Sequence, residues 1–419
     1  MKAKLNIFFV SPEAFPFTKN SELAEVANSL PKFLKQLGHD VRVMMPNYKT
    51  INERKYVLRD VIRLQGLKFK IGDTVVSANG KSAFIPDSKV QIYFLDNKEF
   101  FDAEDSYLAT SSNGHGKVRL EPYAFFSIGC LETLKLLHWQ PDIIHCNNWQ
   151  TALIPLLLKT VYLNDPFFKN SRTLFSVHNF SQQGDFDRAA AKGASFWESF
   201  GDSVRLSEGN PNILQVGLEY ADMLNTVSES YASEALSHSE NGSDLTKILK
   251  ARKDEFFGIS NRIDAHTWNP ETDKLIPYNY TRNDLAGKLQ NKRELLDRFG
   301  LVYAEDTPLL SMITPLSFDK GIDLFIEIVD DLMKMDLSIV ISGTGEDKYH
   351  KELLAIQKRH KKRIGLDFTR DTSLIHLIEA GSDLFLMPSR LEPGGVNQLH
   401  SLAYGTIPIV RKTGALADT

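Results

Sequence analysis

The sequence is poor in cysteine and has no large excess of charge of either sign. Only Cys130 and Cys146 occur among 419 residues, and both lie in apolar segments. Two such thiols do not form a disulfide framework and indicate a reducing compartment, so we expect a cytoplasmic protein. Lysine and arginine total 49 against 53 aspartate and glutamate residues, a formal charge of −4. This balance gives no indication of nucleic acid or an anionic membrane as a partner.

Long apolar runs are also lacking. No segment approaches the roughly 20 apolar residues that a membrane-spanning helix needs. The N-terminal run from Leu5 to Val10 is interrupted by Asn6 and is too short for a signal-peptide core, so we expect it to be a first strand. We find no repeat at a solenoid period, no low-complexity tract and no heptad pattern. A hydrophobic content of 42% is typical of a soluble globular protein.

What the sequence does contain is an alternation of strand and helix signals. The expected strands lie at 5–10, 41–45, 90–95, 142–146, 172–177, within 220–227, and at 308–313, 337–342, 383–388 and 406–411; the expected helices lie at 21–37, 123–137, 152–162, 321–333, 348–360 and 396–404. The segment 60–90 has short alternating runs and glycines, which indicates a hairpin insertion. The order predicts doubly wound α/β domains.

The length of the chain predicts two such domains, because one ordinary core does not extend over 419 residues. Residues 239–300 are polar and interrupt the alternation. We therefore place the boundary near Gly258, with an N-terminal domain at 1–257 and a C-terminal domain at 258–419.

The most informative pattern lies near the C-terminus. The apolar run Asp383–Pro388 is typical of a buried parallel strand, and Val396–Tyr404 has helical character. Gly394 and Gly395 stand between them. A glycine pair that opens a helix at the carboxyl end of a parallel strand suits an anion, because backbone N–H groups can approach it closely. The nearby carboxylate of Glu392 suits sugar hydroxyls instead, so the pattern indicates a nucleotide-sugar site.

Three motifs together carry a resemblance to a known family. The C-terminal run reads MPSRLEPGGVNQLHSLAYGTIPIVRKTGALADT, His178-Asn179 follows an expected strand, and Asn261 begins an Asn-Arg-Ile-Asp loop. From residue 5 to its last residue the chain resembles bacterial glycogen synthases and plant starch synthases. The resemblance implies a retaining glycosyltransferase of the GT-B class, with two doubly wound Rossmann-like domains and an interdomain cleft. It also implies that the C-terminal domain is incomplete at Thr419.

The resemblance further implies a reaction and its partners. Glucose would pass from ADP-glucose, or from UDP-glucose, to the non-reducing end of an α-1,4-glucan, with retention of configuration. The expected partners are the nucleotide-sugar and the glucan, with no metal, no cofactor, no nucleic acid and no membrane. The N-terminal domain would take the glucan side, and the C-terminal domain would bind the nucleotide-sugar.

Individual residues acquire roles from the same resemblance. Glu392 corresponds to a glutamate that holds glucose hydroxyls, and His178 to a histidine that contacts the transferred glucose. Lys320 corresponds to a lysine that neutralises the leaving diphosphate, and such preorganised charge is usually a large catalytic term. These three are the expected catalytic residues. Each also has a structural interpretation: a loop carboxylate near a helix start, a satisfied histidine after a strand, and a solvated surface lysine.

The expected substrate-binding residues are six. Lys19 matches the lysine of a loop that approaches the diphosphate, and Asn261 matches an asparagine that contacts glucose. The other four are those whose backbone amides would hold the diphosphate: Gly394, Gly395, Val396 and Asn397.

Some positions differ from the family pattern. Pro315 stands in place of an arginine, and Glu22 and Arg262 in place of glycines; Arg370 falls at or near the position of an adenine-stacking tyrosine. If the glycine at position 262 needs positive φ, Arg262 is strained. These departures leave two alternatives open. One is a catalytically impaired glucan-binding or scaffold homologue, and the other is a transferase with a different nucleotide-sugar donor.

Overall fold

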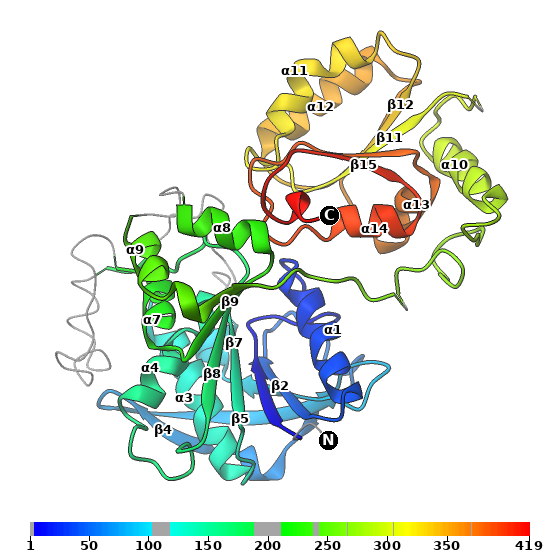
Figure 1. The fold of residues 1–419 in the computed structure, drawn as a ribbon. Helices are drawn as coiled ribbons and strands as arrows, with labels where there is room; N and C mark the ends of the chain where they lie inside the picture. Colours follow the sequence, from blue (N-terminus) through cyan, green and yellow to red (C-terminus); the bar gives the residue numbers. More distant parts are fainter. Residues whose placement is uncertain are drawn as a thin grey trace. The chain divides into compact units, whose positions relative to one another are not determined.

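The computed structural model describes residues 4–102, 118–187, 211–237, 243–265, 267–304, 306–369 and 371–419. The chain divides into two compact units, Met1–Ile259 and Ser260–Thr419 (Figure 1). Each unit is built on a largely parallel sheet with helices packed on it, so the predicted pair of α/β domains is confirmed. Within the described ranges, no helix combines the length and the apolar character that crossing a bilayer requires.

The first unit contains a mixed sheet. Its strands run in the spatial order β10-β9-β8-β7-β1-β2-β6-β5-β3, and β4 pairs with β5 beside this path. The pairs from β10 to β6 are parallel, whereas β5 is antiparallel to β3, β4 and β6. The bounds are β1 Asn6–Val10, β2 Asp40–Pro46, β3 Arg59–Asp60, β4 Leu67–Ile71, β5 Thr74–Phe84, β6 Gln91–Asp96, β7 Ile143–Asn147, β8 Arg172–Val177, β9 Met223–Thr226 and β10 Phe256–Gly258.

The helices of this unit cover the sheet because their apolar faces are buried against it. α1 turns Leu23, Ala24 and Ala27 inward, and α3 is buried around most of its circumference. The bounds are α1 Leu23–Gln36, α2 Lys98–Phe101, α3 Glu121–Leu136, α4 Leu153–Lys159, α7 Ile213–Tyr220, α8 Glu229–Ser237 and α9 Ser243–Ala251, with short 3₁₀ turns η1 Ile62–Leu64, η2 Trp149–Thr151 and η5 Lys253–Glu255.

The second unit contains a smaller sheet whose strands are all parallel and lie in the order β13-β12-β11-β14-β15. Its strands are β11 Leu309–Ile313, β12 Ser338–Ser342, β13 Ile364–Asp367, β14 Leu384–Met387 and β15 Ile407–Val410. Its helices are α10 Ala286–Arg298, α11 Ile322–Leu332, α12 Asp347–Arg359, α13 Thr372–Gly381 and α14 Asn397–Ala403, followed by the 3₁₀ turn η6 Gly414–Ala417.

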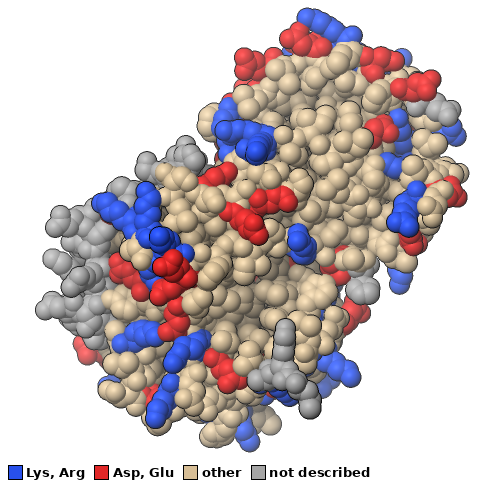
Figure 2. Space-filling model, in the orientation of Figure 1, with Lys and Arg blue, Asp and Glu red and all other residues tan. Residues whose placement is uncertain are grey.

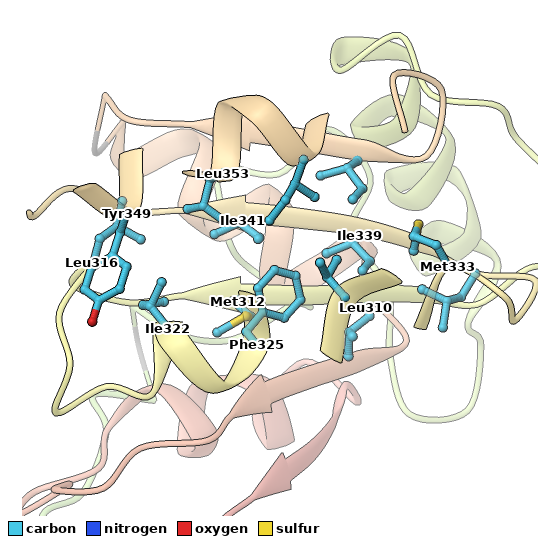
Figure 3. Close-up of a cluster of buried hydrophobic side chains, with 14 residues drawn as sticks. Leu310, Met312, Leu316, Ile322, Phe325, Met333, Ile339, Ile341, Tyr349 and Leu353 are labelled. Carbon is cyan, nitrogen blue, oxygen red and sulfur yellow. The ribbon is translucent and has the colours of Figure 1, made fainter. Parts of the chain in front are cut away.

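One face of this second sheet carries a core that fixes a functional loop. Side chains from α11 and α12 lie on β11 and β12 (Figure 3). Leu316 and Ile322 are fully buried members of this core, and they bracket the loop that contains Lys320. The loop is therefore anchored at both ends by apolar packing.

The structure contains elements that the sequence pattern did not predict. The polar segment 239–300 includes α9, β10 and α10, and the short β13 and the helix α13 were also missed. In α10 only a few residues are buried, and they include Asn291 and Lys292 beside Leu295 and Leu296. Buried polar residues conceal an amphipathic pattern, because the pattern assumes that the inward face is apolar.

Charged side chains of both signs are intermingled on the surface. On the face shown in Figure 2, lysines and arginines lie beside aspartates and glutamates over both units. On this face, therefore, neither sign of charge forms a separate patch.

Candidate active site

In the second unit, Glu392 and Lys320 meet at the carboxyl ends of two neighbouring strands. Lys320 follows β11 and Glu392 follows β14, and these strands pair in parallel. Lys320 Nζ lies 2.9 Å from both carboxylate oxygens of Glu392, which is only 3% exposed. The hydroxyl of Ser389 donates to Glu392 Oε2 at 2.8 Å. A buried charge needs such partners, and this edge of the sheet is where doubly wound folds bind ligands.

A second ion pair connects the two loops that carry these residues. Arg390 donates through both terminal nitrogens to Asp323, at 2.6 and 2.7 Å, and its guanidinium lies 3.9 Å from the centroid of the Phe318 ring. Its backbone N–H also donates to the carbonyl of Asp319 at 2.7 Å. The hydrogen bond from Arg390 is the main cause that lowers the pKa of Asp323. We call this Arg390–Asp323 contact the loop clamp.

The backbone of Gly321 allows the same two loops to approach each other. Its φ is +73°, and a Cβ at this position would lie 2.3 Å from the carbonyl oxygen of Pro388. Any other residue would push the Lys320 loop away from the end of β14. The sequence motifs indicate Lys320 but not Arg390, Ser389 or Asp323, whose contacts hold Lys320 and Glu392 in place. In the sequence, these three residues are distinguished only by lying inside or beside the family motifs.

The stretch Gly394–Asn397 forms the turn that leads into α14. Gly395 has φ +46°, and Val396 occupies the N-cap without a side-chain hydrogen bond. The first N–H groups of a helix have no partner within it. The side chain of Asn397 is committed elsewhere, since it donates to the carbonyl of Ile313 at 2.9 Å. Binding by this stretch would therefore use the backbone amides.

Gln398 is a further polar group at this turn that the sequence analysis did not identify. It is fully buried, and both atoms of its amide lack a hydrogen-bond partner among the residues described. The amide faces Gly395, because a Cβ on that glycine would lie 2.7 Å from Gln398 Nε2. Unpartnered buried amides are costly by about 1–3 kcal/mol, which favours a ligand-binding role.

In the first unit, His178 lies after β8 in a network of neutral polar groups. Its Nε2 is 3.0 Å from Asn147 Oδ1, and its backbone N–H donates to Asn148 Oδ1 at 2.8 Å. His145 Nε2 lies 2.6 Å from the hydroxyl of Ser176. Burial lowers the pKa of His145 to about 4, and burial together with His145 lowers the pKa of His178 to about 3. Both imidazoles are therefore neutral at pH 7.

Lys19 lies in the loop between β1 and α1, half-exposed, and its Nζ is 2.5 Å from Glu25 Oε1. The backbone amides of Asn20 and Ser21 donate to the buried carboxylate of Glu13, at 2.5 and 3.1 Å. Burial raises the pKa of Glu13, although these hydrogen bonds and Lys19 oppose the shift. The loop that was expected to approach a diphosphate thus holds one of the chain's own carboxylates.

Asn261 is the second residue of the second unit, and its Nδ2 is buried without a hydrogen-bond partner among the described residues. Arg262 is absent from the described non-glycine residues with positive φ, so it fits the loop without the backbone strain considered above. Arg370 lies outside the described residues. In the described ranges no cluster of three or more His, Cys, Asp or Glu could hold a metal ion.

The structure thus brings one group of the predicted residues together, in the second unit. Lys320, Glu392 and the turn at Gly394–Asn397 share one edge of the second sheet. In the first unit His178 and Lys19 follow β8 and β1, which both pair with β7.

Comparison with known proteins gives matches in both units. A model of the starch synthase catalytic domain matches residues 6–251, and a model of glycosyl transferases group 1 matches residues 295–419. A glycogen synthase of Chlorobium limicola is 36% identical over 418 residues, covering 100% of this chain and 85% of the relative. A glycogen synthase of Thermotoga petrophila is 39% identical over 422 residues, covering 99% of this chain and 84% of the relative.

A solved structure is similar over nearly the whole chain. It is the catalytic domain of starch synthase IV from Arabidopsis thaliana bound to ADP and acarbose. The TM-score is 0.88 at 28% sequence identity, with 99% of this chain and 84% of that chain covered.

Proposed function

The chain belongs to the glycogen and starch synthase family of glycosyltransferases, and we propose that it transfers glucose from ADP-glucose to the non-reducing end of an α-1,4-glucan, with retention of configuration. ADP-glucose is favoured over UDP-glucose because the similar starch synthase was solved with ADP. The observation that carries the proposal is the buried Glu392–Lys320 pair beside the turn at Gly394–Asn397.

We assign the nucleotide-sugar to the second unit. The backbone amides of Gly394, Gly395, Val396 and Asn397 would bind the diphosphate, as N–H groups at a helix start do. Lys320 would oppose the charge that grows on the diphosphate as it leaves. Glu392 already accepts from Lys320 and Ser389, and an ionised carboxylate has lone pairs left for sugar hydroxyls. Asn261 would supply a further contact to glucose through its buried Nδ2.

We assign the glucan side and one sugar contact to the first unit. With a pKa of about 3, His178 is a neutral hydrogen-bonding group at pH 7 and not a proton donor of the imidazolium type. The attacking hydroxyl would then lose its proton to the departing phosphate, on the same face of the sugar. Lys19 would contribute positive charge toward the diphosphate when it is released from Glu25.

A cytoplasmic location is part of the same proposal. Cys130 and Cys146 are both free and buried, and burial raises the pKa of each thiol. Such inert thiols are typical of proteins kept under reducing conditions.

An incorporation assay tests the proposal. The purified chain should transfer labelled glucose from ADP-glucose into glycogen, and Glu392→Ala should abolish the transfer. Glu327→Ala, which removes an exposed carboxylate from α11, is the matched control and should keep the activity. Failure of the wild-type chain with ADP-, UDP- and GDP-glucose would contradict the proposal. Retention of glycogen on a native gel without turnover would then identify a glucan-binding homologue.

A further inference from the structure

The two ring nitrogens of His178 lie in different environments. Nε2 is 3.0 Å from Asn147 Oδ1. Nδ1 is buried, and no hydrogen-bond partner for it occurs among the described residues. Which nitrogen carries the proton therefore decides what the ring can offer to a ligand.

The orientation of the Asn147 amide is fixed by its own partners. Asn147 Nδ2 lies 3.0 Å from the carbonyl oxygen of Val10 and 3.3 Å from that of His145. Both carbonyls only accept hydrogen bonds, so the NH₂ group must face them and the amide oxygen must face His178. Asn147 is itself only 1% exposed, at the carboxyl end of β7.

The proton of His178 follows from this orientation. Asn147 Oδ1 can only accept, so the hydrogen bond requires a hydrogen on Nε2. The ring carries a single proton at neutral pH, because burial and the neighbouring His145 hold its pKa at about 3. Nδ1 is then left as a lone-pair acceptor. A buried acceptor that has no protein partner is a group that a bound hydroxyl can satisfy.

We propose that Asn147 is a positioning residue that fixes His178 in its Nε2–H form, so that Nδ1 accepts a hydrogen bond from a hydroxyl of the bound carbohydrate. The hydroxyl as ligand rests on the proposed function, whereas the placement of the proton on Nε2 rests on the contacts of Asn147. The backbone hydrogen bond from His178 to Asn148 Oδ1 adds a second anchor from the end of β7. Asn147 acts through His178 and does not itself touch the substrate.

Nitrogen NMR on the full chain with ¹⁵N-labelled histidine tests the first part. Long-range proton–nitrogen correlations should show His178 with a protonated Nε2 and a lone-pair Nδ1, unchanged between pH 6 and pH 9. Asn147→Ala should mix the two tautomers, whereas Asn147→Gln keeps both the amide oxygen and the amide NH₂ and should retain the Nε2–H form. Asn47→Ala is the matched control, because Asn47 is a buried amide that bonds Glu53 and Asp96 and should leave the His178 signals unchanged. A wild-type ring protonated at Nδ1 would overturn the proposal.

Ligand addition and kinetics test the second part. ADP-glucose, without glucan, should shift the Nδ1 resonance of the wild type, and the shift should be weaker in Asn147→Ala. The same variant should lose about tenfold in kcat/KM, equivalent to ~1.4 kcal/mol, and Asn147→Gln should recover most of it. An unchanged Nδ1 resonance with ADP-glucose bound would overturn the carbohydrate contact. Absence of turnover in a wild type that shows the Nε2–H form would count against the proposed function and not against the role of Asn147.

Discussion

The two units hold their candidate groups by different means. In the second unit the groups are charged and form two ion pairs, Lys320 with Glu392 and Arg390 with Asp323. In the first unit the groups around His178 are neutral amides, hydroxyls and imidazoles. A diphosphate needs positive charge that is already in place, whereas sugar hydroxyls need neutral donors and acceptors. The difference supports the proposal that the diphosphate binds to the second unit, and that the neutral groups of the first unit contact hydroxyls in addition to those bound by Glu392 and Asn261.

The largest expected effect comes from Lys320, the cation of the charged group. Lys320→Met keeps the length of the side chain and removes the ammonium that faces Glu392. We expect kcat to fall by roughly 10²–10³, as when one preorganised electrostatic donor is lost. Lys351→Met, on the exposed side of α12, is the control and should leave kcat unchanged. A fall of less than threefold would mean that Lys320 only balances Glu392.

The loop clamp should rank next, because it places Lys320 without touching substrate. Arg390→Ala and Asp323→Asn each break the bidentate contact, and we expect each to lower kcat about tenfold or more through misplacement of the loop. The double variant should be no worse than either single one, since both remove the same link. Arg359 and Asp330 form an exposed pair at 3.0 Å between α12 and α11, and breaking that pair is the control. Additive losses would show that Arg390 and Asp323 act separately.

The stability of the second unit should respond to pH through Glu379. This carboxyl is fully buried, and neither oxygen has a hydrogen-bond partner in the described part of the chain. Burial raises its pKa well above 4.5, with Lys288 opposing. As pH rises above about 4.5, the unfolded chain ionises and the folded chain does not, so folding becomes less favourable.

Glu379→Met should therefore stabilise the chain, and more at pH 7.5 than at pH 4.5. We expect a gain of about 1–3 kcal/mol at pH 7.5, the usual cost of an unsatisfied buried polar group. Thermal unfolding at the two pH values measures it, with Glu352→Met on α12 as an exposed control. Equal shifts at both pH values would mean that packing, and not ionisation, accounts for the gain.

The first unit should show the opposite pH response. The pKa values of His145 and His178 are lowered to about 4 and about 3, against 6.5 for an ordinary histidine. As pH falls below about 6.5, these two histidines bind protons in the unfolded chain but not in the folded chain, so the free energy of unfolding of this unit decreases. Amide hydrogen exchange at pH 5 and pH 7.5 should show β7 and β8 opening more readily at the lower pH, after correction for the intrinsic exchange rate.

The sequence predicted most of the alternation in both units because buried parallel strands are continuous apolar runs. β1, β11, β12 and β14 are of this kind. It missed α10, where polar residues are buried, and β13, where Gly365 and Asp367 interrupt the apolar run. At the site it predicted Glu392 from a carboxylate beside a glycine pair, and Lys320 from the family resemblance. It could not identify Arg390, Gln398 or Asn147 in their roles, because these depend on contacts between distant loops or on the orientation of an amide.

The smallest expected effect concerns Lys19, the one cation among the candidate groups of the first unit. It is half-exposed and 2.5 Å from Glu25, and exposed ion pairs of this kind are typically worth ~0.2–1 kcal/mol. If Lys19 is shared between Glu25 and the diphosphate, Glu25→Gln should lower the KM for ADP-glucose, by no more than about fivefold. Lys19→Ala should raise this KM, and kcat should change little in both variants.

Opposite shifts in KM would show that the first unit also contributes positive charge to donor binding, so the difference between the two units would be smaller than described above. No shift in either variant would leave Lys19 as a surface lysine and would assign all phosphate recognition to the second unit.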